Sequence, residues 1–414
     1  MGAPVTIRRA LLLRRHIDPW LLAAGFGFLA LLQGPGKVIF LVFAACGFYL
    51  ALARHRTCRH LPPVYTAVLI SYCLWGVILS LGRGEPMDGN RLLGYAAIQL
   101  AAVFLPVGLC LVRRPVDAMV LGCRVAVVVL LGATTVEWFM TGERVGLGRN
   151  EAILGFVIAA AALIARMQAD FPPRFVPNGR WWSYVALLPV LLTQTRAAWI
   201  VFVPLIVFDL WAVVRERSGG RPPMAAMAVA AIAMAVAAVP IWKIVTARVV
   251  DGMAEIANLR ETGVASGSMD VRLVMWNHAA ELISEHPLLG VGPTQRMARV
   301  AEAAGAENAA LIGSYTHLHN LFIDEALSSG LVGLALMLAV FATFLVAVFR
   351  ARSPTLTKES SLLFVVLIVS FGAFHGVLIN EWTIILIFGF MAVVMTGMRR
   401  RRLAETGRRL GPAG

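Results

Sequence analysis

The sequence predicts an all-α polytopic membrane protein with about twelve transmembrane helices and one large, helix-containing loop outside the cytoplasm. Two observations carry this prediction. The 414 residues are 59% hydrophobic and only 14% charged, whereas a soluble domain of this length needs a larger charged surface. In addition, arginine clusters recur between long apolar stretches, and short cytoplasmic loops of membrane proteins collect Lys and Arg in this way.

The apolar stretches define the candidate spans. A helix that crosses about 30 Å of hydrocarbon needs about 20 mostly apolar residues. By this criterion the spans cover residues 18–33, 37–54, 62–82, 92–112, 117–140, 151–168, 181–195, 197–214, 223–244, 320–349, 360–379 and 382–398. An even number of spans puts both termini on the same side of the membrane.

The basic clusters assign that side. They comprise Arg8, Arg9, Arg14, Arg15, Arg54, Arg56, Arg59, Arg113, Arg114, Arg174, Arg180, Arg215, Arg217, Arg221, Arg350, Arg352 and the run 399–402. Consecutive clusters are separated by enough apolar sequence for two crossings, so all of them belong in the cytoplasm, with both termini. The net charge of +14 follows from this topology. Because the basic groups form no single stripe, nucleic-acid binding is not expected.

This topology divides the chain into four parts. Residues 1–244 hold the first nine spans, 245–319 form a loop domain outside the cytoplasm, 320–400 hold the last three spans, and 401–414 form a cytoplasmic tail. A loop of about 75 residues is far longer than ordinary connections and is therefore functional or disordered.

The loop has a helical pattern and not a disordered composition. Its apolar residues recur at helical spacing, and they are Val271, Val274, Met275, Ala279, Leu282 and Ile283. Ser268 is the expected N-cap, with Asp270 in the first turn. The opposite, polar face is expected to carry Asn277, Glu281, Ser284 and Glu285. Arg272 falls within the apolar face instead, where the presence of a charged side chain requires an explanation.

Few arginines remain outside the cytoplasm, and they gather near histidines. Arg144, Arg149 and Arg196 lie at outer ends of spans, and Arg272 lies on the loop. Each has a plain alternative role, because an arginine at the membrane interface can extend its head group into water.

The histidines and acids beside these arginines have similar alternatives. His317 and His319 share one face of an extended segment, although this segment could also be a hydrogen-bonded helix start capped by Asn320. His278 and His286 suit polar loop positions. Asp324 and Glu325 lie inside the tenth span, where ionisable residues indicate function by default. The histidine spacing is a weak metal signature, and no metal site or cofactor is expected.

Arginines near an imidazole at an outer membrane face suit a lipid-linked phosphate or diphosphate. Guanidinium groups bind phosphate oxygens in a bidentate manner and stay charged at any pH. A histidine near neutral pKa can take a proton from an attacking hydroxyl. The outer segments contain no Asp-x-Asp metal clamp, so arginines would have to neutralise a leaving diphosphate.

At this point the sequence resembles a known family. Residues 195–199 look like the Ser-Arg-containing turn of the O-antigen ligase and polymerase family. Residues 267–272 and 285–292 are similar to its loop pattern. Residues 317–322 resemble its His-x-His-Asn start of a membrane helix, and residues 330–334 its continuation. Two positions depart from the pattern: Thr195 stands where Ser is usual, and Ser328 stands where Glu often precedes the Gly.

The resemblance implies an inverting, metal-independent glycosyltransferase of GT-C-like architecture, acting at the periplasmic face of the bacterial inner membrane. Such a ligase moves a glycan from undecaprenyl diphosphate to lipid A–core. By matching motif positions, Arg196 and Arg272 would bind the diphosphate and His319 would act as base. Arg149, His317 and Asn320 are further candidates for substrate binding.

Three other functions remain open. An O-antigen polymerase uses the same lipid-linked donor with a different acceptor. A transporter would place ionisable residues near the membrane midplane, whereas Glu137, Asp324 and Glu381 fall at outer ends. A structural or scaffolding role predicts that changing Arg272 leaves glycan transfer intact.

Overall fold

In the computed structural model, residues 5–53, 62–86, 90–217, 253–255, 257–265 and 267–409 are described, and their regular secondary structure is helical throughout, without a strand. Within these described ranges, seven helices are long and apolar enough to cross a membrane, namely Gly34–Ala53, Pro63–Gly82, Pro115–Thr141, Arg196–Val214, Leu321–Arg350, Thr355–Gly372 and Glu381–Arg399. Shorter apolar helices cover His16–Leu31, Leu93–Gly108, Glu151–Ala165 and Trp182–Leu192. The predicted class, an all-α polytopic membrane protein, is confirmed.

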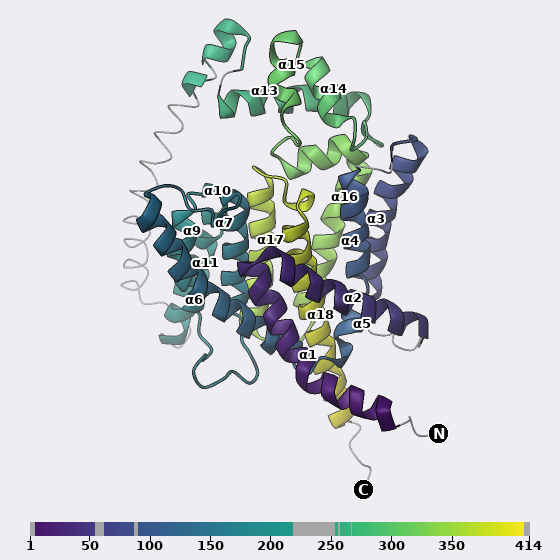
Figure 1. The fold of residues 1–414 in the computed structure, drawn as a ribbon, viewed down its shortest axis with the longest axis vertical. Coiled ribbons are helices and arrows are strands. Elements are labelled where there is room, and N and C mark those ends of the chain that lie inside the picture. Colours follow the sequence, from purple (N-terminus) through teal and green to yellow (C-terminus); the bar gives the residue numbers. More distant parts are fainter. Residues whose placement is uncertain are drawn as a thin grey trace. The chain divides into compact units, whose positions relative to one another are not determined.

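Most observed helices coincide with predicted spans. They are α1 (Val5–Leu31), α2 (Gln33–Ala53), α3 (Pro63–Gly82), α6 (Pro115–Thr141), α7 (Glu151–Ala165), α11 (Phe202–Arg217), α16 (Leu321–Arg350), α17 (Thr355–Gly372) and α18 (Glu381–Arg409) (Figure 1). The predicted span 223–244 lies outside the described residues, so the count of twelve stays a prediction.

Several predicted spans are interrupted within the described residues. The span 92–112 consists of α4 (Arg91–Ala102), α5 (Leu105–Gly108) and η2 (Leu109–Leu111), with Pro106 in the short middle helix. The span 181–195 consists of α8 (Trp182–Val185) and α9 (Leu187–Leu192), which contains Pro189. Proline lacks the backbone donor that a continuous helix needs. The span 360–379 stops at Gly372 and resumes as η3 (Val377–Ile379).

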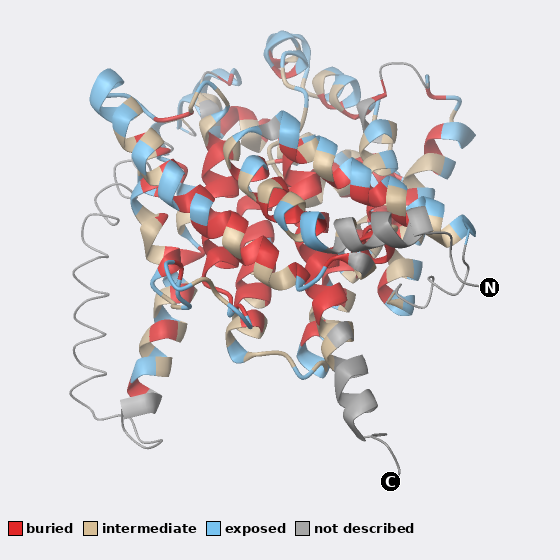
Figure 2. Ribbon diagram, turned by 60° about the horizontal axis from the view of Figure 1, so that its bottom comes forward, coloured by how far each residue is buried: buried red, intermediate tan, exposed pale blue. Residues whose placement is uncertain are grey.

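The chain divides into two compact units. Unit 1 comprises residues 1–201, 335–372 and 377–414, and unit 2 comprises residues 202–334 and 373–376. In unit 1, α6 and α7 pack against each other, α1 packs against α6, and α17 packs against α7. Buried residues line the inner faces of the bundle (Figure 2), and in α7 every residue from Leu154 to Ala165 is buried.

Small residues bring the helices of unit 1 into close contact. A Cβ atom on Gly122 of α6 would lie 2.1 Å from the carbonyl oxygen of Ala23 in α1, and one on Gly108 would lie 2.0 Å from that of Phe43 in α2. Backbone-to-backbone packing of this kind holds membrane helices together, since lipid supplies no hydrophobic drive between them.

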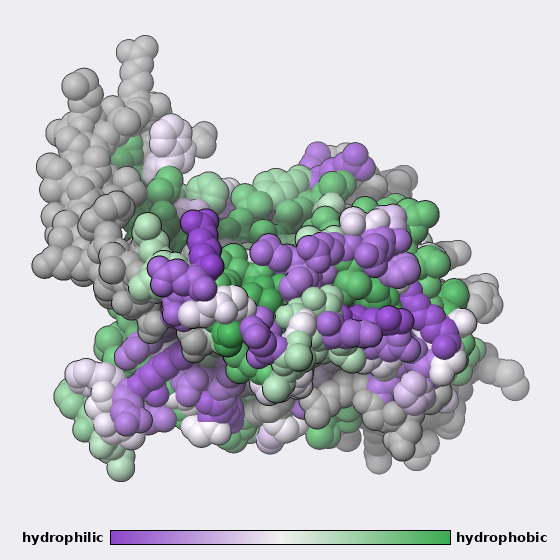
Figure 3. Space-filling view, turned by 90° about the horizontal axis from the view of Figure 1, so that it is seen from above, coloured by the Kyte–Doolittle hydropathy of each residue, from purple (hydrophilic) through white to green (hydrophobic). Residues whose placement is uncertain are grey.

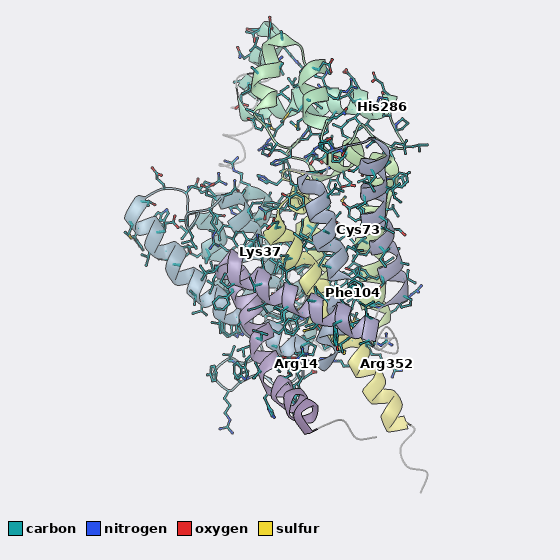
Figure 4. The ribbon with its side chains drawn as sticks, turned by 45° about the vertical axis from the view of Figure 1, so that its right-hand side comes forward. Arg14, Lys37, Cys73, Phe104, His286 and Arg352 are labelled. Atoms are coloured by element: carbon teal, nitrogen blue, oxygen red, sulfur yellow. The ribbon has the colours of Figure 1, made fainter. Side chains whose placement is uncertain are left out.

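Several arginines of unit 1 lie near one of its ends. Arg124 donates to the carbonyl oxygens of Ala165 (2.8 Å), Met167 (2.9 Å) and Val176 (3.1 Å), which ties the start of α6 to the end of α7. Arg180 pairs with Glu359 of α17 at 2.7 Å. Arg14 and Arg352 lie towards the same end, and Lys37 lies well away from it (Figure 4). The gathering of all the basic clusters on one side, and the assignment of that side to the cytoplasm, stay predictions.

Unit 2 contains the helices of the predicted loop. They are α13 (Ser268–Glu285), α14 (Arg296–Ala303) and α15 (Ala306–Gly313), and they precede α16. Val271, Met275 and Ala279 are buried with Val300 and Leu318 in one hydrophobic cluster. The predicted polar face of α13 is exposed at all four positions, so its amphipathic pattern is confirmed. Seen end-on, hydrophilic residues cover much of the visible described surface (Figure 3).

The predicted N-cap of α13 is wrong by one residue. Gly267 is the N-cap, and its backbone N–H donates to both carboxylate oxygens of Asp270, at 2.8 and 3.0 Å. The start of α13 is therefore stabilised by the buried Asp270 and not by a side chain of Ser268, because a carboxylate in the first turn can accept a hydrogen bond from the backbone of the cap residue.

Two glycines let the chain after α13 cross α16 at backbone contact. Gly330 interrupts α16 with φ 74° and ψ 179°, and a Cβ there would lie 2.0 Å from the carbonyl oxygen of Leu288. Gly290 has φ 66°, and its Cβ would lie 2.4 Å from the carbonyl oxygen of Leu327. The crossing is sealed by Val291 N–H donating to Leu327 O at 2.7 Å and Leu331 N–H to Pro287 O at 2.8 Å.

We expect Gly330→Ala to destabilise the protein by more than about 1 kcal/mol, because alanine is incompatible with a positive φ and here also meets a carbonyl. Thermal unfolding in detergent measures this effect. Gly313→Ala is the matched control, because Gly313 ends α15 in the same unit and a Cβ there meets nothing within 4 Å. Equal melting temperatures for the two variants would contradict the tight crossing.

Candidate functional site

The segment before α16 is held by a buried ion pair. Arg296, at the start of α14, donates through Nε to Asp324 of α16 at 2.8 Å, and both side chains are almost fully buried. Arg296 also donates to the carbonyl oxygens of Pro293 and Thr316. Asp324 accepts the backbone N–H of Leu318 at 3.4 Å. The sequence indicated a function for Asp324 because it is an ionisable residue inside a span. In the structure, Asp324 and Arg296 position residues 316–318.

A second anchor fixes the same segment from α13. Trp276 donates through its indole nitrogen to the carbonyl oxygen of Leu318 at 2.7 Å, and the Leu318 side chain is fully buried. With Leu318 held on both sides, the alternate residues His317 and His319 flank a fixed point of the backbone.

The two histidines of this segment lie against each other. Their ring centroids are 4.2 Å apart, and Tyr315 meets the ring of His319 edge-on at 5.5 Å. His317 Nδ1 lies 3.1 Å from the hydroxyl of Thr316. His319 Nδ1 is buried without a hydrogen-bond partner. His319 also has φ 53°, a left-handed backbone that non-glycine residues rarely adopt and that clusters at functional sites.

A third histidine, His375, lies beside this pair, and the sequence analysis did not predict a role for it. The ring centroid of His375 lies 6.0 Å from that of His319. His375 belongs to residues 373–376, which form part of unit 2. The predicted span 360–379 included this position as continuous helix, whereas α17 ends at Gly372 and the chain turns there. A histidine inside an apolar span was the available signal, because ionisable groups at membrane depth are costly.

Arg272 of α13 acts electrostatically on both His317 and His319. Its side chain is half-buried, and burial lowers the pKa of its guanidinium. Burial, together with electrostatic interactions with His317 and Arg272, lowers the pKa of His319 to about 4, against an opposite effect of Asp324. Burial and the charges of Arg296 and Arg272 lower the pKa of His317 to about 4 as well. Both imidazoles are therefore neutral at neutral pH and able to accept a proton.

Three further polar residues of unit 2 that the sequence analysis named have structural positions. Asn320 caps α16, since its side-chain oxygen accepts the backbone N–H of Phe322 (3.0 Å) and of Ile323 (3.2 Å). His278 pairs with Glu281 on the exposed face of α13 at 2.9 Å, and His286 is the exposed C-cap of that helix. Neither of these last two histidines meets the group around His319.

In unit 1 the turn before α10 (Arg196–Trp199) packs on the start of α7. Thr195 is buried and donates its hydroxyl to the carbonyl oxygen of Glu151 at 3.1 Å. Arg144 donates to the carbonyl oxygen of Thr193 at 2.7 Å and contacts the hydroxyl of Thr195 at 3.4 Å. The hydroxyl of Thr195, where the family pattern has Ser, is thus used to fasten the turn. Arg196 follows it, exposed, as the first residue of α10.

Arg149 lies at the same end of unit 1 and is partly desolvated. Its guanidinium carbon lies 4.8 Å from the ring centroid of Trp382. One of its terminal nitrogens is buried without a hydrogen-bond partner, and burial lowers its pKa. An arginine stacked on an aromatic ring with an open donor is well suited to bind an anion.

The structure thus forms two polar groups from the predicted residues. Arg272, His317 and His319 lie together in unit 2, joined by His375, and Arg149 and Arg196 lie at one end of unit 1. Among the described residues, no group of three or more His, Cys, Asp or Glu could hold a metal ion. The first group offers neutral bases beside a cation, and the second offers fixed cations. Neutral bases and fixed cations are the two kinds of group that a transfer reaction with an anionic leaving group uses.

Comparison with known proteins points to the same region. Residues 181–338 match the model of a family described as O-antigen ligase, and this interval contains Arg196, Arg272, His317 and His319. No curated protein matches the chain.

Proposed function

We propose that this chain, whose residues 181–338 belong to the O-antigen ligase family, is an O-antigen ligase of the bacterial inner membrane. Its family and its apolar helices indicate a multi-pass membrane protein of the O-antigen ligase or polymerase type, with glycosyltransferase-like activity and a role in lipopolysaccharide biosynthesis. The proposed reaction moves a glycan from undecaprenyl diphosphate to lipid A–core at the periplasmic face.

One observation supports this proposal most strongly: a neutral histidine beside an arginine at the start of a membrane helix. A general base must be unprotonated at the working pH and held in a fixed position, and it accepts a proton most readily when its pKa lies near that pH. His319 meets the first two conditions, because its pKa is lowered to about 4 and its neighbours Leu318 and Asn320 are held by Trp276 and by capping of α16. The low pKa makes the free imidazole a weaker base than the histidine of near-neutral pKa that the sequence led us to expect.

In the proposed mechanism an acceptor hydroxyl oxygen attacks the anomeric carbon of the donor sugar. His319 takes the hydroxyl proton as the new glycosidic bond forms. The bond between the anomeric carbon and the diphosphate oxygen breaks on the opposite face, which inverts the configuration. The electron pair leaves with the undecaprenyl diphosphate, whose charge Arg196 and Arg272 neutralise, with Arg149 as an additional contact. No metal ion or cofactor takes part in this scheme.

The acceptor separates a ligase from an O-antigen polymerase, and a gene deletion tests which one this chain is. A strain lacking the ligase should make rough lipopolysaccharide while long undecaprenyl-linked polymer accumulates. Complementation with the wild-type gene is the control. If the deletion shortens the polymer to single repeat units instead, the chain is a polymerase.

The lowered pKa of His319 gives a pH prediction. Its folded-state value lies below the ordinary value near 6.5, so the imidazole stays neutral from neutral pH down to about pH 5 and is protonated as pH falls through about 4. We expect kcat/KM to be flat between about pH 5.5 and 8 and to fall only below about pH 5, since kcat/KM reports ionisations of the free enzyme. An acid limb centred near pH 6.5 would contradict a base in this environment.

His319→Ala should lower the transfer rate by about 100- to 10,000-fold, the range typical for loss of a general base. His317→Ala is the matched comparison, because it removes the neighbouring ring, and we expect a milder loss. Single-turnover transfer by the purified variants measures both, and unchanged donor binding by His319→Ala shows that the site is intact. Near-normal turnover by His319→Ala would remove this catalytic assignment.

Arg196→Ala and Arg272→Ala should weaken donor binding, and substitution by lysine should restore it only in part, because lysine keeps the charge but loses the bidentate fork. Binding of an undecaprenyl-diphosphate glycan to each variant measures this effect. Arg299→Ala is the control, since Arg299 is an exposed arginine of α14 that pairs with Glu302 at 3.8 Å. Donor affinity equal to wild type in both alanine variants would place the diphosphate elsewhere.

A further inference from the structure

We propose that a cavity at the basic end of unit 1 binds the headgroup of an anionic glycerophospholipid. The cavity has a volume of about 310 Å³, and its lining includes His16, Trp20, Arg113, Arg114, Asp117 and Phe171. It is formed by α1, the start of α6 and the connection after α7. This is the end that the arginine pattern predicts to be cytoplasmic, and the proposal does not depend on the one for glycan transfer.

The lining carries more positive than negative charge. Arg113 and Arg114 are both exposed. Among the described residues Arg113 has no ion-pair or hydrogen-bond partner, and the guanidinium carbon of Arg114 lies 3.4 Å from the ring centroid of Phe171. The one lining carboxylate, Asp117, is already used, because it accepts the backbone N–H groups of Asp170 (2.8 Å) and Phe171 (3.2 Å).

The wall of the cavity is preformed. Arg124 lines it and is held by three backbone carbonyls between Ala165 and Val176. The Asp117 carboxylate fastens the same connection to α6 from a second point. A site whose walls are already ordered loses little conformational freedom when a ligand enters.

Apolar surface continues from the cavity along α6 and indicates a lipid and not a soluble anion. Leu121 lines the cavity, and Val125, Val128 and Val129 follow at helical spacing with about half of each side chain exposed. At the rim, Trp20 is 68% exposed, and tryptophan is enriched at membrane interfaces. A phosphate group between the arginines would therefore have acyl chains running beside this valine stripe. Basic pockets between membrane helices on the cytoplasmic side bind such headgroups.

The test is lipid titration of the delipidated, purified full-length protein, followed by native mass spectrometry. Cardiolipin and phosphatidylcholine with the same acyl chains are compared for wild type, for the double variant Arg113→Gln/Arg114→Gln, and for the control Arg174→Gln. Arg174 is exposed in the same connection but does not line the cavity. We expect wild type and control to prefer cardiolipin, and the double variant to bind it about 10- to 30-fold more weakly, with phosphatidylcholine binding unchanged.

Two results would overturn the proposal. One is equal cardiolipin affinity in the double variant and the control. The other is displacement of cardiolipin by inorganic phosphate at equal concentration, which would indicate a site for free anions. The melting temperature without added lipid shows whether the double variant is folded. If it is not, Trp20→Ala replaces it, and retention of full cardiolipin affinity by that variant would equally count against the site.

Discussion

The geometry of the candidate site depends on one buried ion pair, Arg296 with Asp324. Two charges withdrawn from water are costly unless each is paired and hydrogen-bonded, and both conditions are met here. Arg296 reaches the carboxylate of Asp324 and two backbone carbonyls, and Asp324 also accepts the N–H of Leu318. The pair therefore joins α14, the histidine segment and α16. Next to this fixed segment, His319 has a left-handed backbone with φ 53°, a conformation that persists only where the surrounding structure holds it.

The same constraint, that polar groups away from water must be satisfied, also shapes the basic end of unit 1. Arg124 donates to the carbonyl oxygen of Ala165, which is open because the last four carbonyls of a helix have no partner within it, and to those of Met167 and Val176 in the connection after α7. The basic end is thus rigid as well as charged. In the histidine group of unit 2, His319 keeps a buried nitrogen without a hydrogen-bond partner, and an unsatisfied buried atom within a cluster of ionisable side chains fits a catalytic role.

Much of this could be predicted from the sequence. The arginine clusters and the apolar spans indicated the class, and the periodicity from Val271 to Ile283 predicted α13 and its buried face. The position of Arg272 within the apolar face of that helix indicated a candidate functional residue. These are local patterns, and local patterns are visible in a single chain.

What the sequence could not predict depends on contacts between distant residues. The helix break that places His375 beside His319, the partnership of Arg296 with Asp324, and the crossing of Gly290 and Gly330 each join segments that no spacing rule connects. Pro106 and Pro189 could have predicted broken spans, because proline removes a backbone donor, but hydropathy alone counted those stretches as continuous.

The central claim is that this protein itself joins a lipid-linked glycan to a lipid acceptor, using histidine and arginine and no metal ion. The most direct measurement incubates the purified protein with an undecaprenyl-diphosphate glycan and lipid A–core in excess EDTA, and analyses the product by mass spectrometry and NMR. A single glycan joined to the core with inverted anomeric configuration is the expected result. Absence of the joined product, or a product that forms only when magnesium or manganese is restored, would contradict the claim.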